Sequence, residues 1–324
     1  MKLDRSLAVI VVNWNGDSHL RACLQALRLQ TYVAFRAIVV DNASTDGSER
    51  IVIEMHDPRF SLMQLPTNVG FAGANNAGVA QCADCDWIAL LNPDAFPEPT
   101  WLAELLAATQ TYPGAAGFGS HLIDAKLPSL SDGTGDSYHV SGRPFRRDHG
   151  TTVEASHRRP GPIFAPCAAA ALYSRQAWQK VGGFDEDFFC YLEDVDLAFR
   201  LRLLGLDFRY VPTAICHHVG SAITGRRSNF SCYYGQRNLV WTYVKNMPGL
   251  LFWCFLPLHL LLNVVAVLLF AARGQLGTVL RAKYDALRAM PQTWRKRQLV
   301  HARRTASLAQ IWAALDKRVW PGPS

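Results

Sequence analysis

Short apolar runs alternate with helical patterns through the first third of this 324-residue chain. Residues 6–12 form a continuous β-rich apolar run, which is typical of a central strand buried on both faces. Further strands are predicted at 37–40, 62–65 and 87–91, and helices at 18–29, 48–56, 72–81 and 100–112. This alternation indicates an α/β fold with a mostly parallel central sheet flanked by helices.

The middle of the chain has a different composition. Residues 124–162 are rich in Gly, Ser, Asp, Arg, His and Pro and have little apolar periodicity, so we predict a long loop or flap. Beyond it the pattern predicts an apolar run at 163–173, a helix at 176–181, a strand at 208–211 and a helix at 228–245.

Residues 250–272 are apolar except for Pro257, His259 and Asn263. At roughly 1.5 Å per residue, a helix of this length can cross a bilayer. A buried helix of a soluble protein is the alternative interpretation.

Charge is unevenly distributed along the chain. Residues 1–245 contain 22 Lys or Arg and 24 Asp or Glu, whereas residues 273–324 contain 11 and 2. The nearly balanced body excludes a general nucleic-acid binder, and the positive excess belongs to the tail.

The eight cysteines do not form a zinc or disulfide framework, since only Cys82 and Cys85 make a CxxC pair. The apolar stretch at the N-terminus is short and lacks a small-residue cleavage site, so it is interpreted as a strand and not as a signal peptide. We therefore expect the body of the protein in the cytosol.

Polar residues follow two of the predicted strands. Asp41 lies in VVDNASTDGS after the strand at 37–40, and Asn92 and Asp94 follow the strand at 87–91. Ligands gather beyond the carboxyl ends of strands in open α/β sheets. Asp41 can accept hydrogen bonds from a base or ribose there, and Asp94 suits Mg²⁺ or Mn²⁺ on a diphosphate. Plain turns are the alternative in both places.

Three further segments carry candidate chemistry. Asn68, Gly70 and Asn75 lie in NVGFAGANN, where glycines and a helix start suit a diphosphate or simply close packing. The acidic residues of YLEDVD lie at the start of a predicted helix. They either cap that helix or include a general base. His217 and His218 follow a strand, and we favour His217 as a metal ligand, although the alternation does not decide between them.

The ordered set of motifs resembles family 2 glycosyltransferases of the GT-A fold, particularly a bacterial rhamnosyltransferase-like branch. The matching segments cover most of residues 6–221 and are VIVVNWNG, VVDNASTDGS, NVGFAGANN, LLNPDA, GGFDEDFFCYLEDVDLAFR and HHVGS. The resemblance implies inverting transfer of a sugar from a nucleoside-diphosphate donor to a glycan or lipid-linked glycan in polysaccharide synthesis. The most frequent donor of the branch is dTDP-rhamnose, and other sugars stay open. We therefore expect a catalytic domain over 1–246, and the apolar run with the basic tail predicts a membrane-associated segment over 247–324.

The resemblance also implies roles for individual residues. Asp194 matches the catalytic base, with Glu193 beside it, and Asp94 matches the last position of a DxD motif that holds a divalent cation, Mg²⁺ or Mn²⁺. The first DxD position is Asn92, which leaves Asp94 as the main metal carboxylate, completed by His217 or His218. The residues assigned to the donor are Asn13, Asp41, Asn68, Gly70, Asn75 and Asn92.

Two rival functions are compatible with parts of the pattern. A nucleotidyltransferase also uses a doubly wound sheet, but it is expected to have a basic Gly-rich loop that VVNWNGDSHL lacks. A membrane-tethered nucleotide-sugar sensor has no need of a base opposite the donor.

The expected location is the cytoplasmic face of the bacterial inner membrane, because nucleotide sugars are made in the cytosol. The basic tail is also expected there, and a single membrane crossing would separate the two. We therefore predict that 250–272 is a hairpin bent at Pro257 or an interfacial helix. The tail, with Trp294, Trp312 and Trp320, would then lie on anionic headgroups.

Overall fold

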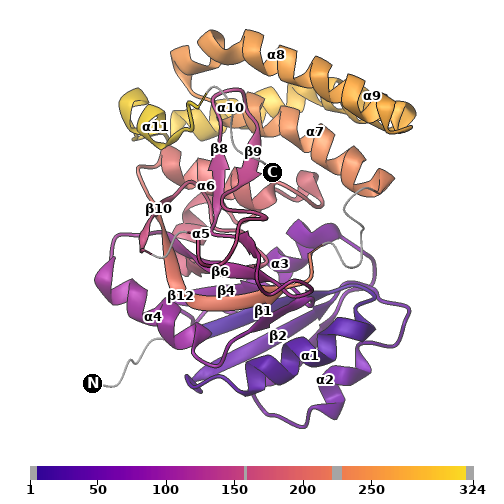
Figure 1. The fold of residues 1–324 in the computed structure, drawn as a ribbon, viewed down its shortest axis with the longest axis vertical. Helices are drawn as coiled ribbons and strands as arrows, with labels where there is room; N and C mark the ends of the chain where they lie inside the picture. Colours follow the sequence, from indigo (N-terminus) through magenta and orange to yellow (C-terminus); the bar gives the residue numbers. More distant parts are fainter. Residues whose placement is uncertain (1–5, 157–158, 221–227, 319–324) are drawn as a thin grey trace.

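A computed structural model describes residues 6–156, 159–220 and 228–318; Trp320 and the serine of the HHVGS motif, Ser221, lie outside these ranges. The fold is a large sheet with helices on both faces and a further layer of C-terminal helices (Figure 1). The elements of the first half are β1 (Leu7–Asn13), α1 (Asp17–Arg28), β2 (Phe35–Asp41), α2 (Arg50–Glu54), β3 (Phe60–Gln64), α3 (Gly70–Ala80), β4 (Trp87–Leu91), β5 (Ala95–Pro97), α4 (Trp101–Thr111) and β6 (Gly117–Asp124).

The second half begins with short strands and ends in helices. Its elements are β7 (Ser131–Gly133), β8 (Asp136–Tyr138), β9 (Pro144–Arg146), β10 (Gly161–Ile163), β11 (Ala170–Ser174), α5 (Arg175–Val181), α6 (Glu193–Leu203), β12 (Phe208–His218), α7 (Asn229–Asn246), α8 (Gly249–Ala272), α9 (Leu276–Arg288), α10 (Met290–Ala302) and α11 (Leu308–Ala314), with a 3₁₀ turn at Glu186–Phe188.

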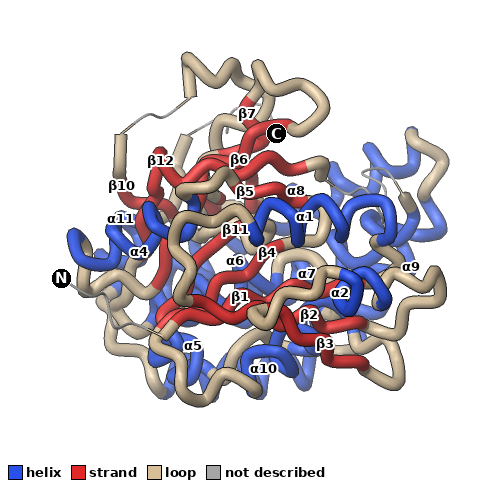
Figure 2. Tube along the Cα trace, turned by 90° about the horizontal axis from the view of Figure 1, so that it is seen from below, coloured by secondary structure: helices blue, strands red, loops and turns tan. Residues whose placement is uncertain are grey.

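The main sheet has the strand order β10-β12-β6-β11-β4-β1-β2-β3 (Figure 2). The pairs β4-β1, β1-β2 and β2-β3 are parallel, whereas β11 runs antiparallel to both of its neighbours. Every residue of β1 is buried, as its continuous apolar run predicts for a strand covered on both faces. The predicted α/β class with a mostly parallel sheet is confirmed.

Side-chain alternation along β1 builds two separate cores. Val9 and Val11 pack with α1 and α4 on one face, while Ile10 packs with α3 on the other. Gly78 of α3 is required for this contact, because a Cβ there would lie 2.8 Å from the Ile10 side chain. The tight packing fixes the strand ends that carry the site.

The prediction of a long loop or flap at 124–162 is wrong in part, because the segment contains short strands. This segment contains β7, which pairs with β6, and the hairpin β8-β9, in which Asp136 lies opposite Arg146. The strands have three residues each and carry glycines and charges, so no apolar period identifies them.

The apolar run 250–272 forms one continuous helix, α8, through Pro257. The predicted hairpin is therefore wrong. A proline removes one backbone hydrogen bond from a helix. The turns around it are held by packing, since Phe255 stacks on Trp312 and His259 stacks on Tyr243.

Candidate active site

A cavity of about 390 Å³ opens at the carboxyl ends of β1, β4 and β12. The N-terminus of α6 and the β8-β9 hairpin complete its walls. Its polar lining consists of Asn42, Asn68, Asn92, Asp94, Asp136, Arg146, Cys167, Glu193, Asp194 and His218. Six of the predicted site residues thus meet here from segments far apart in the chain, namely Asn68, Gly70, Asn92, Asp94, Glu193 and Asp194.

Asn13 and Asp41 end the adjacent strands β1 and β2, and both are buried. The Asn13 amide donates to Asp41 Oδ1 at 3.1 Å and to Ser48 Oγ at 2.7 Å. Neither side chain lines the cavity described above, and the pair shapes the strand ends next to it.

Asn42 organises the loop that enters α3. Its amide nitrogen donates to Asn68 Oδ1 at 2.9 Å, its amide oxygen accepts from the Val69 backbone N–H, and Asn68 Oδ1 also accepts from the Gly70 N–H. Gly70 has φ +78°, and a Cβ there would lie 2.4 Å from the Phe189 carbonyl oxygen. The sequence analysis named only the neighbouring Asp41 at this strand end.

Asn75 was predicted to face the donor, and the structure does not support that position. Its amide donates to the Phe71 carbonyl oxygen one helical turn earlier, at 2.8 Å, and the side chain is buried outside the cavity lining. The helix turns this position toward the protein interior.

The choice of His217 is corrected in the same way. His218 lies in the cavity with its Nε2 3.5 Å from Asp94 Oδ1, whereas His217 faces Glu98 at 3.4 Å. Successive residues of a strand point to opposite faces, so only one of the two histidines can face the site.

Asp132, which the sequence interpretation overlooked, orients His218. It is buried, and Oδ2 accepts from His218 Nδ1 at 2.8 Å and from Arg146 at 2.6 Å. Burial raises the pKa of Asp132, but Arg146, His149 and His218 outweigh it and hold that pKa well below its usual range. A carboxylate on the far nitrogen of a histidine is a common support for a metal ligand.

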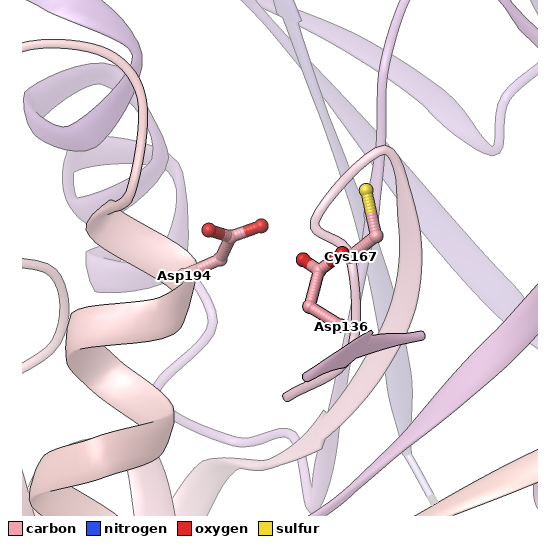
Figure 3. A group of neighbouring side chains, drawn as sticks. All are labelled: Asp136, Cys167 and Asp194. Atoms are coloured by element: carbon pink, nitrogen blue, oxygen red, sulfur yellow. The ribbon is translucent and has the colours of Figure 1, made fainter. Parts of the chain in front are cut away.

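The Asp136 and Asp194 carboxyl groups face each other near Cys167 (Figure 3). Asp194 Oδ2 accepts from the Ala168 N–H and Oδ1 from the Val195 N–H, which fixes its orientation at the start of α6. Burial raises the pKa of Asp194 despite these hydrogen bonds and Arg146. Burial also raises the pKa of Asp136, to about 7, and the Asp194 charge adds to this against the opposing effect of Arg146.

The other acids of this helix have different surroundings. Burial, reinforced by Asp194, raises the pKa of Glu193 well above its usual value. Asp196 is a structural anion, bound by Arg200 at 2.8 Å, by Lys245 at 2.6 Å and by Asn246. Only Glu193 and Asp194 of the three line the cavity.

The segment before α6 has a strained backbone. Phe189, Tyr191 and Leu192 have φ of 63°, 70° and 66°, in the left-handed region that non-glycine residues rarely occupy. Asn238 of α7 holds this segment, because its amide donates to the carbonyl oxygens of Phe188, Cys190 and Tyr191 at 2.8 to 2.9 Å.

We expect Asn238→Ala to reduce the catalytic rate while the chain still folds. The substitution removes the amide that donates to the strained segment. The carbonyl oxygens left without a donor lower the free energy of unfolding by about 1–3 kcal/mol. The displaced loop then misplaces Asp194. Steady-state kinetics and thermal unfolding of the same preparation check this, and wild-type turnover in a measurably destabilised variant would contradict it.

Comparisons with known proteins agree with this architecture. The model of glycosyl transferase family 2 matches residues 8–182, more than half of the chain. An N-acetylglucosaminyl-diphospho-decaprenol L-rhamnosyltransferase of Mycobacterium tuberculosis is 31% identical over 245 residues, covering 68% of this chain and 78% of that protein. The succinoglycan biosynthesis protein ExoA of Rhizobium meliloti is 27% identical over 215 residues, covering 62% of this chain and 59% of that protein.

Two solved structures share the fold. GalNAc-T7, solved with UDP, GalNAc and Mn²⁺, has a TM-score of 0.62 at 14% identity. The match covers 76% of this chain and 48% of the GalNAc-T7 chain. The mannosyltransferase PcManGT of Pyrobaculum calidifontis, in complex with GDP-Man and Mn²⁺, has a TM-score of 0.54 at 17% identity and covers 96% and 88%. The fold is GT-A, and the chain belongs to glycosyl transferase family 2.

Proposed function

We propose that the protein is an inverting glycosyltransferase that moves a sugar from a nucleoside-diphosphate donor to a hydroxyl of a lipid-linked glycan. The observation that carries the proposal is that a single cavity contains two separate groups of acidic side chains. Asp94 and His218 lie together at the strand ends, and Asp194 lies with Asp136 at the start of α6.

The donor is proposed to lie along the strand ends. Asn42, Asn68 and Gly70 frame its diphosphate at the start of α3, where backbone N–H groups and the helix dipole favour anions. Asn13 and Asp41, hydrogen-bonded to each other at the ends of β1 and β2, support the nucleoside side of the site. Asn92 follows β4 and lines the cavity beside Asp94.

The side chains of Asp94 and His218 fit a divalent cation. His218 Nε2 is buried and lies 3.5 Å from Asp94 Oδ1, and within the described ranges of the chain it makes no hydrogen bond to any other group. A bound Mg²⁺ or Mn²⁺ would stabilise the negative charge that develops on the departing diphosphate. We assign it here and not to the Asp136–Cys167–Asp194 group, because burial raises the pKa of the Cys167 thiol and a neutral thiol is a poor ligand for a hard cation.

Asp194 is proposed as the general base. It takes the proton of the acceptor hydroxyl while that oxygen bonds to the anomeric carbon and the bond from this carbon to the diphosphate oxygen breaks. A single displacement inverts the anomeric centre and leaves the nucleoside diphosphate. Burial raises the pKa of Asp194, which strengthens it as a base, and burial also raises the pKa of the facing Asp136, to about 7.

The acceptor class is inferred from the relative of known chemistry. That protein's name specifies a decaprenol-linked N-acetylglucosaminyl diphosphate and rhamnose. We therefore propose dTDP-rhamnose first among donors and a polyprenyl-diphosphate-linked N-acetylglucosamine first among acceptors.

A donor panel tests the function directly. The purified full chain is incubated with Mn²⁺ or Mg²⁺, a short-chain polyprenyl-diphosphate N-acetylglucosamine and individual nucleotide sugars, and products are read by mass spectrometry. We expect a glycosylated lipid and free nucleoside diphosphate. Three outcomes would each contradict the proposal. They are release of nucleoside diphosphate without any acceptor product, formation of a nucleotide sugar from sugar phosphate, and binding without turnover.

A further inference from the structure

The outer face of α8 and α9 exposes a large apolar surface. Nine large apolar side chains of α8 are more than one third exposed, among them Leu261 at 57% and Leu268 at 65%. On α9 the exposed apolar residues Leu276, Leu280, Tyr284 and Leu287 recur at helical spacing. The two helices lie side by side at the end of the molecule farthest from the sheet (Figure 1). Monomeric soluble proteins rarely expose so extensive an apolar surface without a partner.

The polar residues of α8 face the protein instead. His259 Nδ1 lies 2.8 Å from the Ser141 carbonyl oxygen, and its ring stacks on Tyr243 at 4.0 Å. Lys283 of α9 donates to Asn263 Oδ1 at 2.6 Å. The inner face of α8 is therefore fixed to the body of the protein, and its outer face is almost purely apolar.

This arrangement does not suit a helix that crosses a bilayer. By length and composition α8 is the one such candidate within the described chain, since its 24 residues span roughly 36 Å. However, α9 packs alongside it and carries Arg281, Lys283, Asp285 and Arg288. A crossing would carry these charges into hydrocarbon at high cost or would break the contacts with Ser141 and Asn263.

We propose that the outer face of α8 and α9 docks in the plane of an anionic lipid leaflet. The apolar rows enter the acyl boundary, while the exposed Arg273, Arg281, Arg288 and Arg295 reach phosphate headgroups. Residues 247–324 then form a docking segment for the body, and the body and the basic tail stay on the same side of the membrane. The inference does not depend on the transfer chemistry, because it concerns binding to lipid alone.

Vesicle flotation of the full chain tests the surface. We expect it to float with phosphatidylcholine vesicles containing phosphatidylglycerol, and Leu261→Glu with Leu268→Glu to weaken binding at least tenfold. Leu29→Glu is the matched control, because Leu29 is 68% exposed and lies directly after α1, in the body of the protein. Unchanged flotation of the double variant, or an equal loss in the control, overturns the proposal.

Thiol labelling separates the alternatives. Cys254 on α8 is the exposed cysteine, and the other seven are buried or half-buried, so vesicles should protect it from an impermeant maleimide. In a Cys254→Ser background, Arg273→Cys should label from outside the vesicles. Labelling of Arg273→Cys only after detergent would establish a crossing, and a dimer that protects Cys254 without lipid would establish a second copy as the occupant; either result overturns in-plane docking.

Discussion

Asp194→Asn is expected to lower the transfer rate by roughly 10²–10⁴-fold while donor binding stays within a few-fold of the wild type. Asn keeps the shape of the side chain, and its amide oxygen can still accept from Ala168 or Val195, but it cannot take the proton of the acceptor hydroxyl. Single-turnover rates and calorimetric donor titration measure the two quantities separately. Turnover within about tenfold of the wild type would remove Asp194 as the base.

The neighbouring acid provides a control for this experiment. Glu193→Gln alters the adjacent carboxyl, which lines the same cavity and whose pKa is raised by burial and by Asp194. If the transfer rate fell further in Glu193→Gln than in Asp194→Asn, Glu193 and not Asp194 would be the base.

The pH profile reports the same group. A base must be ionised, so kcat/KM rises with pH through the pKa of Asp194, which burial places above the ordinary value for Asp of about 3.9. The groups that face it are Asp136 on β8, Arg146 on β9, Cys167 and Glu193. In Asp194→Asn this acid limb should disappear from the residual activity.

Asp94→Ala is expected to cost about 10²–10³-fold in rate, or roughly 2.7–4 kcal/mol of transition-state stabilisation, and to weaken donor binding in the presence of Mn²⁺. The variant removes the carboxylate that, with His218, is proposed to hold the cation against the diphosphate. Removal of divalent ions with EDTA should abolish wild-type activity, and added Mn²⁺ or Mg²⁺ should restore it. Full activity in exhaustively chelated enzyme would exclude the metal role.

The two adjacent histidines make this prediction specific. His218→Ala should lose activity comparably to Asp94→Ala, whereas His217→Ala should stay within a few-fold of the wild type, since His217 faces Glu98. Equal losses in both histidine variants would show a general effect on β12 and not the loss of a ligand.

The order of strands and helices was readable from the sequence because burial on both faces leaves a strong local signal. The strand predicted at 87–91 is β4 without a shift, and the first helices and strands differ from prediction mainly at their ends. Asp94 and Asp194 were also found locally, since one follows a buried strand and the other opens a helix. Both positions are defined by a few consecutive residues.

Features that depend on distant contacts were not readable in this way. Asp132 and Asp136 lie in a segment without apolar periodicity. Asp132 reaches His218 because β7 pairs with β6, and Asp136 reaches the cavity on the β8-β9 hairpin. Asn238 is fifty residues from the Phe188 carbonyl oxygen that it binds. No local sequence pattern predicts the position of a side chain whose hydrogen-bond partners lie on another helix or strand.

What the sequence determined by itself was the α/β class, the family and the carboxylates at element ends, because hydrophobic period and terminal position are local properties. Tertiary structure decided which histidine faces Asp94, that Asn75 is buried, and that α8 continues through Pro257. Each of these depends on which face of an element meets a neighbour. That is set by packing between segments far apart in the chain, and not by the residues on either side.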